Sequence, residues 1–410
     1  MKAILDGIRV LDLTQYFAGP HTTLLLAGLG AEVIRIDNPA TGDGLSDAPV
    51  YVGPDGPSFE RQGPDDLGIA FLKRCRAKKA VTIDLKSPDG HALFLRLVEQ
   101  SAVVVENFSV GVTERLGIDY AALSARNPGL VYCSVTGLGS TGPDRHQRSY
   151  DVTAQALSGL MSITGMPGQP PTKAGSPLAD AIASSFAMGG VLGALFHRER
   201  TGEGQHVDVS MVDCLFALLF DEALDCYGQL ELPFQQGNRI LRFSPFNSYR
   251  TRDDWMVIGV GSEPQWHALL GVMDREDLKD HPDYSRPGWR VANNAEVDAL
   301  VGAWTATMDT ADAVTRLQDA GVVASPVHDI DDLKRWPHLK ARDMIVPLVH
   351  PKLGELPGIG AANFPIKFSA TPGGYDTPAV PSGTHNREIF GELLGLDGDE
   401  LKRLEDEGAI

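Results

Sequence analysis

A strand, a helix and a second strand occupy the first 37 residues and constrain the fold more than any other part of the sequence. Ile8–Leu13 alternates apolar and polar residues, His21–Leu29 is a helical run, and Ala31–Asp37 is a second apolar strand. Two strands joined through a helix pair in parallel. The sequence therefore predicts an α/β fold with a Rossmann-like, doubly wound parallel sheet.

The glycine pattern argues against a nucleotide cofactor in this sheet. The turn after the first strand, Thr14–Pro20, lacks the G-x-G-x-x-G cradle that binds a dinucleotide phosphate. Gly137–Gly142 matches that spacing, but Pro143 and a polar run follow it where the motif requires a helix. We therefore reject a bound NAD and dehydrogenase chemistry.

Composition limits the domain count and the classes of partner. A chain of 410 residues exceeds one ordinary domain, and its net charge of -18 disfavours nucleic acid and anionic membranes as partners. The four cysteines show no metal-ligand spacing, which is typical of a reduced, cytoplasmic protein, and we expect no metal and no permanently bound cofactor. We predict a large α/β domain over residues 1–225, a smaller α+β domain over 226–345, and a return of residues 346–410 to the large domain.

Two stretches are candidates for function. Lys73–Lys79 is a basic cluster in an acidic chain, and it is either a phosphate-binding edge or a solvated loop. Asp180 follows a Gly/Pro-rich loop and stands at the start of a long helical run of small residues, with Pro177 in the first turn and Ser176 as a candidate cap. From these residues alone, Asp180 is either part of the helix cap or a carboxylate nucleophile.

Several further segments together carry a resemblance to the class III CoA-transferase family, which includes formyl-CoA transferase, carnitine CoA-transferase and α-methylacyl-CoA racemase. They cover nearly the whole chain and are Gly7–Asp12, Gly30–Ile36, Val105–Phe108, Gly111–Gly117, Gly137–Pro143, Arg200–Gln205, Pro365–Ser369 and Gly408–Ile410. The resemblance implies a CoA-transferase that acts on an acyl-CoA and a small carboxylic acid, with CoA as substrate, and an interlocked homodimer.

The resemblance also implies roles for individual residues. Asp180 takes the position of the catalytic aspartate, which would carry a covalent aspartyl intermediate. The positions expected to contact CoA are Lys78, Lys79, Lys86, Asn107, Arg115 and Arg148, and the candidates for the substrate site are Tyr150, Phe17 and Gly139.

Departures from the family pattern leave alternatives open. Asn38 stands where a CoA-binding arginine is expected, so Arg74 or Arg76 is a candidate replacement, and Gly228–Asp254 lacks the glycine loop of formyl-CoA transferase. Racemases carry a histidine where this chain has Tyr150, which favours the transferase branch. Racemase-type acid–base chemistry and a non-catalytic CoA-binding subunit remain the alternatives.

Overall fold

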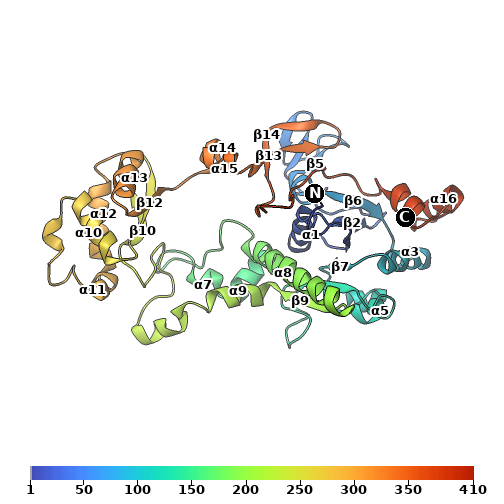
Figure 1. Ribbon diagram of the computed structural model, residues 1–410, viewed down its shortest axis with the longest axis horizontal. Helices are drawn as coiled ribbons and strands as arrows, with labels where there is room; N and C mark the ends of the chain where they lie inside the picture. Colours follow the sequence, from blue (N-terminus) through green and yellow to red (C-terminus); the bar gives the residue numbers. More distant parts are fainter. Residues whose placement is uncertain (1) are drawn as a thin grey trace. The chain divides into compact units, whose positions relative to one another are not determined.

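A six-stranded parallel sheet forms the centre of the larger of two units in the computed structural model, which describes residues 2–410. Neighbouring strands run parallel in the order β6-β2-β1-β7-β8-β9. The predicted α/β class is confirmed, because β1, α1 and β2 form the expected crossover (Figure 1). The bounds are β1 Arg9–Asp12, α1 Ala18–Gly28, β2 Glu32–Asp37, β6 Lys78–Thr82, β7 Val103–Glu106, β8 Val131–Thr136 and β9 His206–Ser210.

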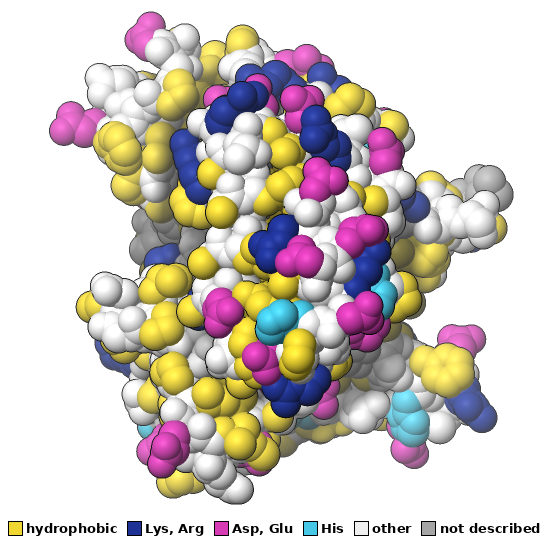
Figure 2. Space-filling model, turned by 90° about the vertical axis from the view of Figure 1, so that its left-hand side faces the viewer, with side chains coloured by type: hydrophobic (Ala, Val, Ile, Leu, Met, Phe, Trp, Pro, Cys, Tyr) yellow, Lys and Arg dark blue, Asp and Glu magenta, His cyan; other side chains and the backbone are white. Residues whose placement is uncertain are grey.

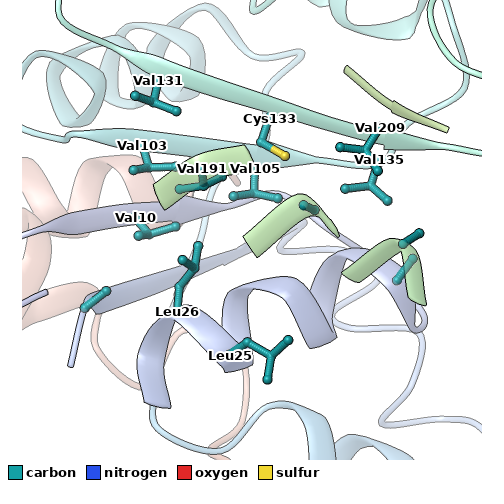
Figure 3. Packing of buried hydrophobic residues seen from close by; sticks show 14 of the residues in the cluster. Val10, Leu25, Leu26, Val103, Val105, Val131, Cys133, Val135, Val191 and Val209 are labelled. Atoms are coloured by element: carbon teal, nitrogen blue, oxygen red, sulfur yellow. The ribbon is translucent and has the colours of Figure 1, made fainter. Parts of the chain in front are cut away.

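Alternate side chains of these strands build a separate core on each face of the sheet. Val10 belongs to the core beneath α1 and α8 (Leu178–Thr201), whereas Leu11 belongs to the core beneath α3 (Pro88–Glu99) and the C-terminal helix. Figure 3 shows the first core, in which Leu26 of α1 packs with the valines of the sheet. The alternation fixes the strand register, because a slip by one residue would exchange the two faces.

Helix α8 packs closely on the sheet because its inner face is built from small residues. Ala183, Ala187 and Val191 are fully buried, and a Cβ on Gly190 would lie 2.6 Å from Cγ1 of Val207 in β9. By length and composition alone, α8 is also the one helix among residues 2–410 that could cross a membrane. Its apolar inner face packs on α1, β8 and β9.

The C-terminal segment returns to the larger unit. A hairpin of β13 (Ile345–His350) and β14 (Gly354–Ala362) leads to α16 (Gly398–Asp406). The amide of Asp84 donates to the carbonyl of Ala409 at 2.8 Å, and Ile410 is buried in the core around Leu11. The sheet domain is therefore built from both ends of the chain, as predicted.

The second unit, formed by Met161–Thr172 and Leu224–Pro337, is a small α+β structure. An antiparallel sheet carries its helices on a core around Trp266 and Ile258 (yellow to orange in Figure 1). Met161–Thr172 joins this unit because the side-chain amide of Gln235 donates to the carbonyl of Thr164. The bounds are β10 Phe246–Arg250, β11 Trp255–Gly259, β12 Val323–Pro326, α10 Glu263–Val272, α12 Asn294–Thr305 and α13 Thr310–Asp319.

Charge is mixed on the surface drawn in Figure 2, where acidic and basic side chains are interspersed among apolar ones. Interspersed charges of both signs are typical of a solvated surface. The face drawn therefore has the charge pattern of a solvated surface.

Candidate active site

A cavity of about 370 Å³ lies at the carboxyl edge of the parallel sheet, where ligands bind in folds of this type. Its lining comes from the loops that follow β1, β7 and β8, together with the segment before α6 (Asp151–Leu157) and the first turn of α8. Asp180, Asn107, Arg148, Tyr150 and Phe17 line this one cavity. Five residues that the sequence assigned to catalysis, CoA contact or the substrate site are thus brought together.

Asp180 is held in the first turn of α8 by a neighbouring carboxylate. Oδ1 of Asp151 accepts from the backbone amide of Ala179 at 2.8 Å and from that of Asp180 at 3.4 Å. The expectation that Ser176 caps the helix is wrong, because α8 begins at Leu178 with no side-chain cap from the adjacent chain. A carboxylate suits this place, since helix N-termini leave amides unpaired and favour negative charge.

The environment of Asp180 acts on the pKa of its carboxyl group in both directions. Burial raises the pKa of Asp180 to about 6, and the nearby charge of Asp151 adds to the rise. Arg74 and the backbone amide of Ala18, the first residue of α1, act in the opposite direction and stabilise the carboxylate. A half-buried carboxyl group in a polar cavity is typical of a functional site.

Arg74 ends α2 (Ile69–Arg74) and reaches the same region. Its guanidinium carbon lies 3.9 Å above the ring of Phe17, the residue directly before Ala18. Burial lowers the pKa of Arg74, and burial with the cations Lys78, Arg74 and Arg76 lowers the pKa of His21 to about 4. At neutral pH the guanidinium is therefore charged and the imidazole is not.

Lys78 does not lie where the resemblance implied. Its side chain is completely buried, and Nζ donates to Oδ2 of Asp12 at 2.9 Å, to Oγ1 of Thr23 at 2.7 Å and to the carbonyl of Pro20 at 2.9 Å. All three donor positions of the ammonium group are used. The predicted CoA contact of Lys78 conflicts with this burial, and the residue instead anchors the start of α1.

Lys79 and Arg76 are also committed elsewhere. Nζ of Lys79 forms ion pairs with Glu32 and Glu388, each at 2.6 Å, at the amino end of β6 and away from the carboxyl edge. The buried guanidinium of Arg76 donates to the carbonyls of Lys73 and Ala362. These contacts disfavour Lys79 as a CoA contact. They also disfavour Arg76 as the replacement for the arginine expected at Asn38.

A second cavity, of about 550 Å³, adjoins the first, since Gln15, Phe108 and Val112 line both. Lys86 and Asn38 lie in its wall, and Lys86 is exposed. Asn107 stands at the junction, where its side chain both accepts from and donates to the backbone of Gln15 at 2.8 Å. Together the two cavities form a long site at one edge of the sheet.

The remaining predicted residues lie around this site in different ways. Tyr150 is 68% exposed and meets Tyr16 edge to face, with ring centroids 6.3 Å apart. Arg115 is exposed on α4 (Val112–Leu116), beside Gly111. Gly139 lies in the turn after β8 and donates to Oγ1 of Thr136, whereas its neighbours Gly137 and Leu138 line the first cavity.

Sequence reasoning overlooked the acid that caps α8 and two nitrogen-bearing side chains of the cavity wall. Asp151 was considered only as the neighbour of Tyr150, and Arg145 and His146 were treated as part of a polar run. Arg145 and His146 could have been found from their position in a polar run between a glycine turn and a helix start. No local pattern links Asp151 to α8, because 28 residues separate it from Ala179.

Comparison with known proteins decides the family. The sequence model of CoA-transferase family III matches residues 5–386. The chain belongs to CoA-transferase family III. This confirms the resemblance to that family and the expectation that the protein is a CoA-transferase.

Individual relatives extend over almost the whole chain. It is 35% identical to a succinyl-CoA–D-citramalate CoA-transferase of Chloroflexus aurantiacus, covering 98% of this chain and 96% of the relative. It is 34% identical to a succinate–glutarate CoA-transferase of Agrobacterium fabrum, with 97% of each protein covered. The crystal structure of a CAIB/BAIF family protein from Brucella suis matches with a TM-score of 0.81 at 30% identity, over 96% of this chain and 100% of that one.

Proposed function

We propose that this CoA-transferase moves CoA from an acyl-CoA to a carboxylic acid through a covalent intermediate on Asp180. The observation that carries the proposal is the setting of this carboxylate. It lies in a cavity at the carboxyl edge of the sheet, accepts from the amide of Ala18, and lies within electrostatic reach of Arg74. A carboxylate in such a place is a nucleophile that needs no metal or redox group for acyl transfer.

The first half-reaction loads CoA onto the protein. An Oδ atom of Asp180 attacks the thioester carbonyl, the C–S bond breaks, and a mixed anhydride and CoA thiolate form. The thiolate then attacks the carboxyl carbon of Asp180, so that the donor acid leaves as a carboxylate and an aspartyl-CoA thioester remains. The amide of Ala18 is placed to stabilise negative charge on the oxygen atoms of this carboxyl group.

The second half-reaction repeats these steps with the acceptor. Its carboxylate attacks the aspartyl thioester and releases CoA thiolate, and the thiolate then attacks the acyl carbon of the new mixed anhydride. The acceptor leaves as its CoA ester, and Asp180 is restored as a carboxylate. We propose that CoA occupies the second cavity, with Lys86 and Arg115 near its phosphate groups and Asn107 where the two cavities meet.

We propose a second copy of the chain as the partner. Aromatic side chains on α8 and α9 (Met211–Leu219) and directly after α9 remain exposed: Phe186 by 47%, Phe196 by 65%, Phe216 by 49% and Phe220 by 56%. Exposed apolar surface of this kind is typical of protein interfaces. One chain has a mass of 44.0 kDa, and light scattering coupled to size-exclusion chromatography should give twice that mass. A monomer at micromolar concentration would contradict the proposal.

The proposed reaction is tested with succinyl-CoA or acetyl-CoA as donor and a panel of carboxylic acids as acceptors. We expect one new CoA ester per donor acid released, with ping-pong kinetics, and a loss of at least about 10³-fold in kcat for Asp180→Asn. The same samples in deuterated water test the racemase alternative. Exchange of an α-proton without CoA transfer would overturn the proposal.

A further inference from the structure

Glu106 is a buried carboxyl group to which the proposed reaction gives no role. It is the last residue of β7, at the carboxyl edge of the parallel sheet, and it lines a third cavity, of about 280 Å³. Burial raises the pKa of Glu106 to about 7, and the charges of Glu114 and Asp208 add to the rise. Among the described residues, no lysine or arginine lines this cavity. A buried acid without a counter-charge is unfavourable, so its place in the sheet requires an explanation.

Glu106 holds the turn that follows β7. Its Oε2 accepts from the backbone amide of Phe108 at 2.8 Å, and the side chain of Ser134 on β8 also stabilises its charged form. Asn107, the residue between Glu106 and Phe108, is bound to the backbone of Gln15 through both its carbonyl oxygen and its amide nitrogen. One carboxylate thus ties the end of the sheet to the turn that carries Asn107, where the first two cavities meet.

The turn depends on its hydrogen bonds because it forms part of the walls of three cavities. Phe108, Ser109 and Val110 line the first cavity, which contains Asp180, and also the third cavity beside Glu106. Phe108 lines the second cavity as well and packs only partly against the core around Leu11. A segment between cavities is not fixed by close packing on both sides, so the bond from the amide of Phe108 is what ties it to the rigid sheet.

We propose that Glu106 is a positioning residue for CoA. By accepting from the amide of Phe108, it holds residues 107–111 where the acyl-CoA passes from the second cavity to Asp180. The proposal rests on the function proposed above and adds to it a residue that does not itself touch the substrate. The acceptor oxygen is what the amide of Phe108 requires, so CoA affinity should follow the reach and the acceptor of the side chain at this position rather than its charge.

Binding of free CoA, measured by isothermal titration calorimetry, tests the proposal without turnover. Glu106→Gln keeps an acceptor at the same reach, and its Kd should stay within about threefold of the wild type. Glu106→Asp keeps the charge but is one methylene shorter, and Glu106→Met keeps the length without the acceptor, so both should raise Kd roughly tenfold. In ping-pong kinetics, kcat/KM for the acyl-CoA should fall in parallel. By contrast, kcat/KM for the acid should change less than about threefold, because CoA is already held covalently in the second half-reaction.

Asp66→Leu is the matched control. Asp66 is also buried and accepts from the backbone amides of Gln62 and Gly63, in a turn outside the walls of the three cavities. This variant should lose stability in urea, as Glu106→Met does, but keep the CoA affinity of the wild type. If Glu106→Met does not fold, the contrast between Glu106→Gln and Glu106→Asp still decides the question.

Two results would overturn the role of Glu106: equal Kd values for Glu106→Gln and Glu106→Asp, or an equal loss of CoA affinity in Asp66→Leu. A wild-type protein that binds CoA but transfers it to no acid from any donor would instead overturn the proposed function. The failure of one proposal is therefore distinguishable from the failure of the other.

Discussion

Two aspartates contact the first two turns of α1 and differ in how their charges are balanced. Asp12 is buried, pairs with Nζ of Lys78 at 2.9 Å, and accepts from the hydroxyls of Thr14 and Thr23. Asp180 is half-buried, accepts from the amide of Ala18, and has a second carboxylate, Asp151, beside it. The start of α1 thus contacts one carboxylate that forms an ion pair with a lysine and another that lies near a second carboxylate.

This difference indicates a structural role for the charge of Asp12 and a functional role for the charge of Asp180. The ion pair of Asp12 and Lys78 satisfies its own donors and acceptors, so a ligand has nothing to bind there. Around Asp180 the balance is incomplete, because burial and the charge of Asp151 outweigh Arg74 and the amide of Ala18 and raise the pKa of Asp180 to about 6. Such an incomplete balance costs stability, which is a common cost of functional sites.

Removing the buried lysine should have the largest effect on stability. Lys78→Met leaves Asp12 buried without a counter-charge, which should lower the free energy of unfolding by about 3–5 kcal/mol. Lys79→Met breaks only partly exposed pairs and should cost about 1 kcal/mol or less. Urea denaturation measures the free energy of unfolding of both variants. Equal losses of stability in the two would contradict the distinction between a buried and an exposed ion pair.

Removing the charge of Asp180 should instead raise the free energy of unfolding. Its folded-state pKa, about 6, lies above its ordinary value of 3.8, so the ionised form destabilises the native state. One pKa unit corresponds to about 1.4 kcal/mol, so Asp180→Asn should stabilise the fold by roughly 3 kcal/mol above pH 6, and the gain should vanish as the pH falls below 4. Urea melts from pH 4 to 8 check this, and a gain independent of pH would contradict it.

The neighbouring carboxylate should set the pH at which activity begins. Asp151 raises the pKa of Asp180, which must be ionised to attack, so kcat/KM should rise with pH through an inflection near pH 6. In Asp151→Asn, which keeps an acceptor for the amide of Ala179, this inflection should move to lower pH. Asp151→Glu retains the charge and serves as control; a shift of the same size there would exclude the electrostatic explanation.

The smallest effect should come from the exposed lysine of the second cavity. Lys86→Ala removes one solvent-exposed charge from the proposed CoA site, so KM for the acyl-CoA should rise about threefold at low salt and less at high salt. KM for the acid should stay constant. Lys402→Ala on α16, also exposed, is the matched control, and an equal rise there would remove Lys86 from the site.

The sheet could be predicted from the sequence because its signals are local. Alternation around Val10 and Leu11 marks a strand whose side chains reach two faces, and Pro177 correctly placed Asp180 near a helix start. The cluster Lys73–Lys79 was harder to interpret, because the sequence does not distinguish the surroundings of two adjacent lysines. In β6 they point to opposite faces, so that Lys78 is buried and Lys79 is not.

The site was only partly predictable because its decisive contacts join distant segments. Asp151 caps α8, Arg74 stacks on Phe17, and Ala18 donates to Asp180, and in each case the partners come from different elements. Neither spacing nor composition records such pairs. The resemblance supplied the position of Asp180, and the three-dimensional arrangement supplied its neighbours.

The covalent intermediate is the most direct test of the account. The protein is incubated with succinyl-CoA, quenched with hydroxylamine during turnover, digested and mapped by mass spectrometry, with Asp180→Asn in parallel. We predict a hydroxamate on Asp180 that requires the CoA ester and is missing from the variant. CoA transfer that proceeds with no modification, or with the modification on another residue, would contradict the central claim that Asp180 is the nucleophile.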